Sequence, residues 1–191
     1  DKEGNKVSKG GALYFSGTGN LTIKSELVQS GNKFQTIATE FNANSAVRGG
    51  GAYIETNGGT VSISNVMVEG NIGVYSTDGN YDKAATYVSQ GAGFWIGGSS
   101  ANRVTVENTT FTGNTQADIT WGGGLYVENV GLNLINTTFF ENTANHGGGL
   151  YVNGANVSML NTTIAYNTAT DKLHLGAGGG GGMLVTGSGA V

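Results

Sequence analysis

A glycine-led block of six residues recurs along the chain and constrains its fold more than any other feature of the sequence. Small residues, nearly all glycine, precede an apolar, an aromatic and a second apolar residue, and in the last copy Leu184 takes the aromatic position. The copies span residues 10–15, 49–54, 91–96, 122–127, 147–152 and 180–185. A block that returns in this way is typical of a repeat architecture, in which each unit packs on its neighbours.

Two further patterns follow the block in a fixed order. Short apolar–polar–apolar segments, which predict strands with one buried face, occupy residues 21–23, 61–63, 104–106, 132–134 and 157–159. From the second segment onward, another apolar residue comes seven residues after the segment begins, and Asn follows three positions later: Val68 and Asn71, Phe111 and Asn114, Phe139 and Asn142, Ile164 and Asn167. Three short strands in one unit predict a coil of a parallel β-solenoid, whose strands pair with their counterparts one coil away.

We expect one β-helix domain over residues 10–191, with insertions near 24–36 and 72–90, behind a polar leader or N-terminal cap over 1–9. The sequence stops at Val191, where the second strand of a new coil is due. We therefore expect either a piece of a longer protein or an open end that the next subunit of a head-to-tail stack completes. A sandwich of antiparallel hairpins is the structural alternative.

The first unit of the chain is ambiguous. Both the step from Leu21 to Val28 and the step from Phe34 to Phe41 have the seven-residue spacing of the other units. Only the second step continues to Asn44 and the next glycine block. One of the two segments is therefore expected to be an insertion.

Charge and composition argue against several classes of function. The net charge is −4 and the nine basic residues are scattered singly, so no basic stripe is available for phosphates and nucleic acid is not an expected partner. The chain has no cysteine, which excludes disulfides and thiolate metal sites. No apolar stretch approaches the roughly 20 residues of a transmembrane helix, so we expect no transmembrane segment. No cofactor is expected.

The aromatic residues of the blocks are the main candidates for a contact surface. They lie between the inward-pointing apolar residues of the first strand, so they should project outward as a ladder. The ladder comprises Tyr14, Tyr53, Trp95, Tyr126 and Tyr151. Three roles stay open: cross-strand packing alone, contact with another protein, and stacking on sugar rings.

A second candidate ladder is structural. Its members are Asn44, Asn71, Asn114, Asn142 and Asn167. They fall at a corner of the coil, where Asn tolerates a left-handed backbone and stacked amides can hydrogen-bond from coil to coil.

Metal and catalytic sites have little support in the sequence. Asp78, Asn80 and Asp82 form a weak Ca²⁺ candidate, because Lys83 stands where a calcium loop needs Gly; a polar loop tip is the better interpretation. Glu55 and Glu128 share a column of the repeat but lie two coils apart. This is not the cluster that polysaccharide lyases and hydrolases gather on successive coils, so we expect no enzyme activity.

The repeats resemble those of the chlamydial polymorphic outer membrane proteins, which combine a Gly-Gly-Ala-aliphatic motif with a Phe-x-x-Asn motif. Here these read Gly10-Gly11-Ala12-Leu13, Phe41-Asn42-Ala43-Asn44, Phe111-Thr112-Gly113-Asn114 and Phe139-Phe140-Glu141-Asn142, with Ile164-Ala165-Tyr166-Asn167 as a variant. The resemblance covers nearly the whole chain from Gly10 onward. It implies a surface-exposed adhesin on a right-handed parallel β-helix.

The sequence therefore predicts an all-β protein, a right-handed parallel β-helix (a pectin-lyase-like β-solenoid) of about six coils with three short strands each. We expect a non-catalytic structural or adhesive element, extracellular or on the cell surface, either an adhesin segment or a filament subunit. Expected partners are further copies, end to end or lateral, or a host or cell-surface protein or glycan. The alternative is a β-helix that binds or degrades polysaccharide.

Overall fold

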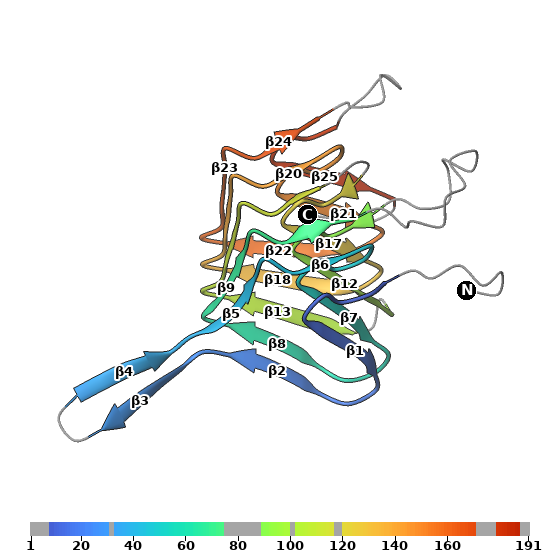
Figure 1. The fold of residues 1–191 in the computed structure, drawn as a ribbon. Helices are drawn as coiled ribbons and strands as arrows, with labels where there is room; N and C mark the ends of the chain where they lie inside the picture. Colours follow the sequence, from blue (N-terminus) through green and yellow to red (C-terminus); the bar gives the residue numbers. More distant parts are fainter. Residues whose placement is uncertain are drawn as a thin grey trace.

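The computed structural model describes residues 8–30, 33–74, 89–99, 102–116, 120–170 and 179–187. Strands of equivalent position lie above one another in successive coils (Figure 1). The prediction of an all-β parallel solenoid is confirmed. The sandwich alternative is wrong, since β3 and β4 form the only antiparallel pair among the described strands.

The glycine-led blocks form the first wall, a six-stranded parallel sheet. In spatial order its strands are β1 (Leu13–Gly17), β7 (Ala52–Thr56), β12 (Phe94–Gly98), β17 (Leu125–Glu128), β21 (Leu150–Asn153) and β25 (Met183–Thr186). The blocks pair position by position, so Tyr53 lies opposite Trp95 and Tyr126 opposite Tyr151. Each column of the sequence repeat is therefore a column in space.

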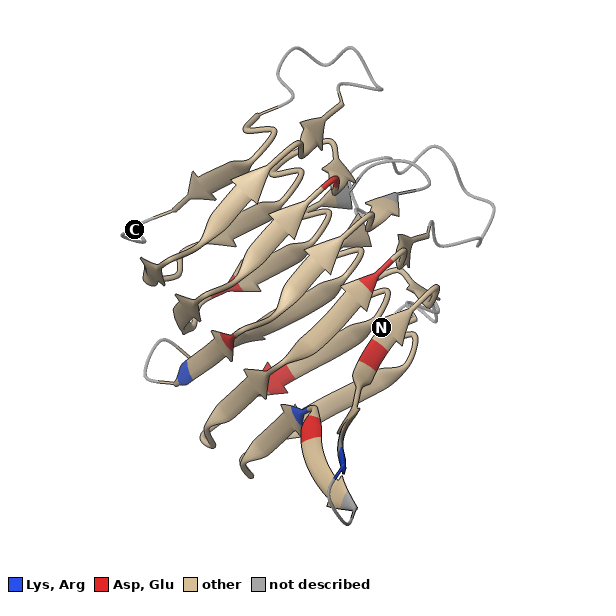
Figure 2. Cartoon of the chain, turned by 90° about the vertical axis from the view of Figure 1, so that its left-hand side faces the viewer, with Lys and Arg blue, Asp and Glu red and all other residues tan. Residues whose placement is uncertain are grey.

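The other two predicted strands of each unit form two further walls. The second wall contains β2 (Leu21–Lys24), β8 (Val61–Ser64), β13 (Arg103–Glu107), β18 (Gly131–Ile135) and β22 (Val157–Leu160), and the third contains β5 (Thr39–Asn42), β9 (Val66–Glu69), β14 (Thr110–Thr112), β19 (Thr138–Phe140) and β23 (Thr163–Ala165). Short strands lead back toward the first wall: β6 (Ser45–Ala46), β10 (Ile72–Gly73), β11 (Ser89–Gln90), β15 (Thr115–Gln116), β16 (Thr120–Trp121), β20 (Thr143–Ala144) and β24 (Thr168–Ala169). Charged residues are scattered singly over the walls (Figure 2).

The three walls enclose one apolar core. The inward residues of the first wall are fully buried in its central coils, as Ile54, Ile96 and Val127 show. Phe111 and Phe139 of the third wall stack with their ring centroids 4.9 Å apart. Apolar residues thus alternate with outward residues along each strand and provide the hydrophobic stabilisation of the helix.

Glycine is required where the chain enters the first wall because successive coils approach too closely for a side chain. Gly49 has a φ of 63°. A Cβ atom on Gly50 would lie 2.2 Å from the carbonyl oxygen of Ala92 and 2.8 Å from that of Ile72. Glycine therefore sets the distance between coils at this corner.

The Asn corner differs from the prediction in one detail. The left-handed residue is not the ladder Asn but the residue before it: Ala43, Gly70, Gly113, Glu141 and Tyr166, with φ between 54° and 60°. Left-handed Asn residues occur instead between the second and third walls, at Asn65, Asn108, Asn136 and Asn161. The ladder Asn residues therefore act through the hydrogen bonds of their side-chain amides and do not adopt the left-handed backbone conformation themselves.

A β-hairpin projects from the stack between the second and third walls of the first coil. It consists of β3 (Glu26–Ser30) and β4 (Lys33–Ile37) and extends away from the walls (Figure 1). At its base, Ser25 Oγ accepts a hydrogen bond from the Thr39 N–H at 2.7 Å, and Thr39 Oγ1 donates to the Lys24 carbonyl at 2.7 Å. The hairpin therefore loops out of the first coil, and Phe41 takes the place opposite Val68.

Candidate functional site

The aromatic ladder of the first wall is formed as a continuous stack. Ring centroids lie 5.3 Å apart between Tyr14 and Tyr53, 4.3 Å between Tyr53 and Trp95, 6.4 Å between Trp95 and Tyr126, and 5.2 Å between Tyr126 and Tyr151. The rings of each pair are nearly parallel. The parallel register places each ring on the next one, so the stack follows directly from the repeat.

Most of this stack is not an open contact surface. Tyr14 is 55% exposed, whereas Tyr53, Trp95, Tyr126 and Tyr151 are between 0 and 7% exposed. The four rings form a second apolar cluster, on which Trp121 packs at 5.4 Å from the Tyr151 ring. The rings thus lie apart from the central core, on the outward side of the first wall, but of the ladder only Tyr14 is open to solvent. A contact role for the ladder stays a prediction.

Burial changes the acidity of two phenols in this cluster. It raises the pKa of Tyr53 to about 12; the Glu55 carboxylate adds to the effect and Arg48 opposes it. The pKa of Tyr126 is raised further, again chiefly by burial and then by Glu128. Both hydroxyls therefore stay protonated at neutral pH and can donate hydrogen bonds.

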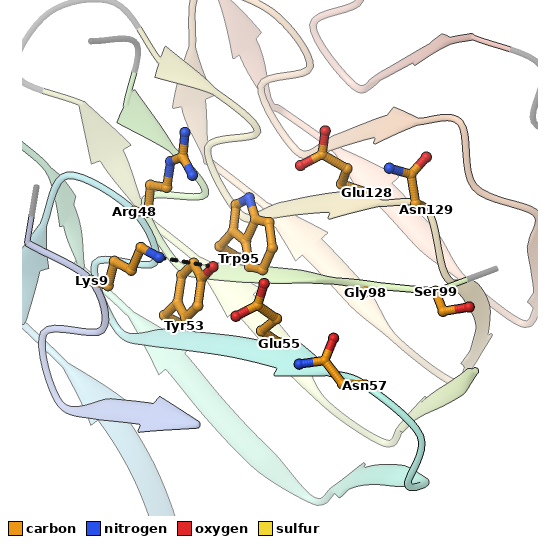
Figure 3. Close-up of a pocket in the computed structure, with 10 residues that line it drawn as sticks. All are labelled: Lys9, Arg48, Tyr53, Glu55, Asn57, Trp95, Gly98, Ser99, Glu128 and Asn129. Atoms are coloured by element: carbon orange, nitrogen blue, oxygen red, sulfur yellow. Dashed lines mark hydrogen bonds between the residues drawn. The ribbon is translucent and has the colours of Figure 1, made fainter. Parts of the chain in front are cut away.

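A groove of about 510 Å³ lies beside the ladder. The rings of Tyr53 and Trp95 line it together with two cations and two carboxylates, and Asn57 and Asn129 add amide groups (Figure 3). The cations are Lys9 and Arg48, and the carboxylates are Glu55 and Glu128. Its volume falls in the range of roughly 300–1,000 Å³ that is typical of ligand pockets.

Register explains how the two carboxylates come to share the groove. Glu55 lies opposite Gly97, which lies opposite Glu128. A Cβ on Gly97 would lie 2.2 Å from Trp95 Cη2, so the missing side chain gives the indole its space. The backbone positions of Glu55 and Glu128 are therefore two strands apart, about 9.6 Å at the usual strand spacing, and the strand between them carries Trp95.

The charged groups of the groove have few partners. Lys9 Nζ donates to the Tyr53 hydroxyl at 3.3 Å and lies 4.6 Å above the centroid of that ring. Glu55 accepts a hydrogen bond from Ser16 at 2.8 Å, and Glu128 accepts one from Asn153 at 3.0 Å. Within the described part of the chain, none of the four charged side chains forms an ion pair.

The indole nitrogen of Trp95 is a buried donor that has no acceptor among the described residues. Figure 3 draws it at the edge of the ring that lies between Arg48 and Glu128. An unsatisfied buried N–H costs about 1–3 kcal/mol. Trp95 therefore brings to the groove a donor for which the described residues supply no acceptor.

The Asn ladder is a chain of amide hydrogen bonds along the coil axis. The Nδ2 group of each member donates to Oδ1 of the next, at 3.1 Å for Asn44, 2.9 Å for Asn71, 2.8 Å for Asn114 and 2.9 Å for Asn142. The same Oδ1 atoms also accept the backbone N–H of the preceding member. Asn71, Asn114 and Asn142 are fully buried, so this ladder belongs to the structure of the helix and not to a surface site.

The calcium candidate Asp78, Asn80 and Asp82 lies outside the described residues. In the part of the chain that the structure describes, no group of three His, Cys, Asp or Glu side chains is placed to hold a metal ion. The described ranges also contain no helix of the length and apolar character that a membrane crossing requires.

The sequence predicts an insertion near residues 24–36 but not that it forms a projecting hairpin. Leu27 is 66% exposed and Ile37 57% exposed. The sequence does contain a signal for a hairpin at this position. Gly31-Asn32 stands between residues 26–30 and 33–37, and a Gly-Asn pair is typical of two-residue hairpin turns.

Comparison with known proteins bears on the repeat itself. Neither the search of curated proteins nor the search of solved structures gave a match. Residues 136–153 match the family model described as the Chlamydia polymorphic membrane protein repeat, so the predicted resemblance is confirmed for this coil. This stretch runs from the corner before β19 to the end of β21 and includes Asn142 and the glycines 147–149.

Proposed function

We propose that this chain is a non-catalytic adhesive β-helix that is displayed outside the cell, on the cell surface. The match of residues 136–153 to a repeat of Chlamydia polymorphic membrane proteins supports a surface location. The residues that carry the repeat are engaged in holding coils together, as the buried Asn142 shows. We therefore expect contacts with a partner to be made by residues at positions where one coil differs from the others.

The observation that carries the adhesive role is the β3–β4 hairpin. Residues opposite each other in an antiparallel pair share a face, and successive residues alternate between faces. Ile37 pairs with Glu26, so Ile37 and Leu27 lie on opposite faces of the hairpin. Both are more than half exposed, so the described chain covers neither face. A projecting hairpin that exposes an apolar side chain on each face is suited to contact with a partner protein.

The test uses beads coated with the purified chain and counted on cultured epithelial cells. The double variant Leu27→Ser/Ile37→Ser removes the apolar side chains of the arm. A matched control, Leu160→Ser/Tyr166→Ser, removes two comparably exposed side chains, 59% and 80%, near the opposite end of the stack. We expect at least threefold fewer beads to bind per cell when they carry the Leu27→Ser/Ile37→Ser variant, called the arm variant. Beads that carry the control variant should bind like those that carry the wild type. Both variants should have the circular dichroism spectrum of the wild type.

Equal bead binding by the arm variant and the wild type would refute the role of the hairpin. Wild-type binding no greater than that of uncoated beads would refute adhesion itself. The proposed lack of catalysis predicts that the chain releases no reducing ends from a panel of polysaccharides, and release would contradict it. Self-association, end to end or lateral, is checked by light scattering and negative-stain imaging of the same preparation.

A further inference from the structure

We propose that the groove beside the aromatic ladder binds a saccharide that carries a carboxylate, such as a uronic or sialic acid unit. The proposal concerns Arg48, Trp95, Glu55 and Glu128. It is independent of the adhesive role of the hairpin, which projects between the other two walls.

The first argument is the separation of unpaired charges. Arg48 forms no ion pair or hydrogen bond through its guanidinium within the described chain, and it lies at the corner that precedes β7. Glu55 lies near the far end of the same strand, and Glu128 lies two strands further along the stack. The guanidinium is therefore available for two parallel hydrogen bonds to a ligand carboxylate, the arrangement that favours Arg over Lys.

The second argument is the chemistry of the remaining lining groups. Among the described residues, Glu55 and Glu128 each accept only one hydrogen bond, from a neutral donor, although a carboxylate offers about four acceptor positions. Asn57 and Asn129 supply both donors and acceptors. Sugar hydroxyls donate and accept at the same atom, so they satisfy carboxylates and amides at once.

The third argument is the unsatisfied Trp95 N–H. Trp95 is 4% exposed, and no described residue accepts a hydrogen bond from its indole nitrogen. In Figure 3 it lies on the side of the ring toward Arg48 and Glu128. A carboxylate or hydroxyl oxygen held by Arg48 would give this donor an acceptor, and a neighbouring ring atom would then rest against the ladder.

Competing ligands fit less well. A polyphosphate or nucleic acid would meet Glu55 and Glu128 as well as the two cations. A simple carboxylic acid would leave both carboxylates and both amides without new partners. A zwitterionic peptide would pair with the cations and the carboxylates of the groove, but it has no hydroxyl groups for Asn57 and Asn129. The experiment therefore includes a dipeptide among its probes.

The experiment follows Trp95 fluorescence in a Trp121→Phe background, which leaves one tryptophan. The probes are methyl β-D-glucuronide, the methyl glycoside of N-acetylneuraminic acid, the uncharged amide of the glucuronide, cyclohexanecarboxylate and the dipeptide Gly-Gly. We expect at least one acidic saccharide to bind tenfold or more tightly than the amide, cyclohexanecarboxylate and the dipeptide. Saturation-transfer NMR on the unsubstituted chain checks that the background substitution has not created the site.

Arg48→Gln should remove the advantage of the acid over its amide, and Arg48→Lys should retain part of it. Arg103→Gln, an exposed arginine on the second wall, is the matched control and should change nothing. The proposal is overturned if neither acidic saccharide binds, if Arg48→Gln binds the acid as the wild type does, or if cyclohexanecarboxylate or the dipeptide binds equally well. The bead assay with the hairpin variants is unaffected by these outcomes, so the two proposals fail separately.

Discussion

Removing one buried amide from the Asn ladder should destabilise the helix far more than removing a terminal one. Asn114 accepts hydrogen bonds from the Nδ2 and backbone N–H groups of Asn71, and it donates to Asn142 Oδ1 and to the Val68 carbonyl. Asn114→Ala therefore loses four hydrogen bonds at about 1 kcal/mol each. It also leaves the buried Asn71 backbone N–H without this acceptor, which adds about 1–3 kcal/mol.

The expected loss is therefore about 5–7 kcal/mol, a large part of the 5–15 kcal/mol that is typical of domains. Asn44→Ala is the matched control, because the side chain of Asn44 makes one ladder bond, to Asn71, and should cost about 1 kcal/mol. Urea unfolding monitored by circular dichroism measures both free energies, provided that each transition is two-state. If Asn114→Ala costs no more than Asn44→Ala, the buried ladder is not a major source of stability and the reasoning is wrong.

Three further outcomes are expected. Gly50→Ala places a methyl group 2.2 Å from the Ala92 carbonyl oxygen and should lower the unfolding free energy by more than about 3 kcal/mol in the same urea assay, whereas a loss below 1 kcal/mol would show that the coils can separate there. Gly97→Ala should displace the Trp95 indole and shift the tryptophan emission to longer wavelength; an unchanged spectrum would contradict the packing. Tyr53 has a folded pKa of about 12 against an unfolded value of 10, so its contribution to stability is fully present below pH 10 and is lost as pH rises from 10 to 12. Tyr53→Phe should flatten the pH dependence of the unfolding free energy in that window, and an identical slope would refute this assignment.

The walls and their register could be predicted from the sequence because every coil repeats the same local conditions. The glycines of each block are needed at a close approach between coils, and apolar residues alternate on each strand, so spacing alone locates them. The same logic gave the Asn ladder. It could not place the left-handed residue one position earlier, because Ala43, Glu141 and Tyr166 carry no signal of their own for that conformation.

The burial of the aromatic ladder and the groove could not be predicted because they depend on contacts between different columns. Trp121 belongs to a corner column, yet it packs on Tyr151 of the next block. Arg48 and Lys9 belong to the same corner column, and only the fold brings them beside Glu55. Gly97 appears in the sequence as a gap in the column of Glu55 and Glu128, and only the structure shows that the indole fills it.

The closed base of the hairpin makes this corner a natural graft point. Ser25 and Thr39 are joined by a hydrogen bond, so the first coil is complete without the segment between them. Because the entropic cost of closing a loop rises only slowly with its length, peptides of very different size can be inserted there while the rungs above keep their geometry. A lineage carrying this scaffold can exchange what it presents at this corner without rebuilding the support, and an engineer can do the same.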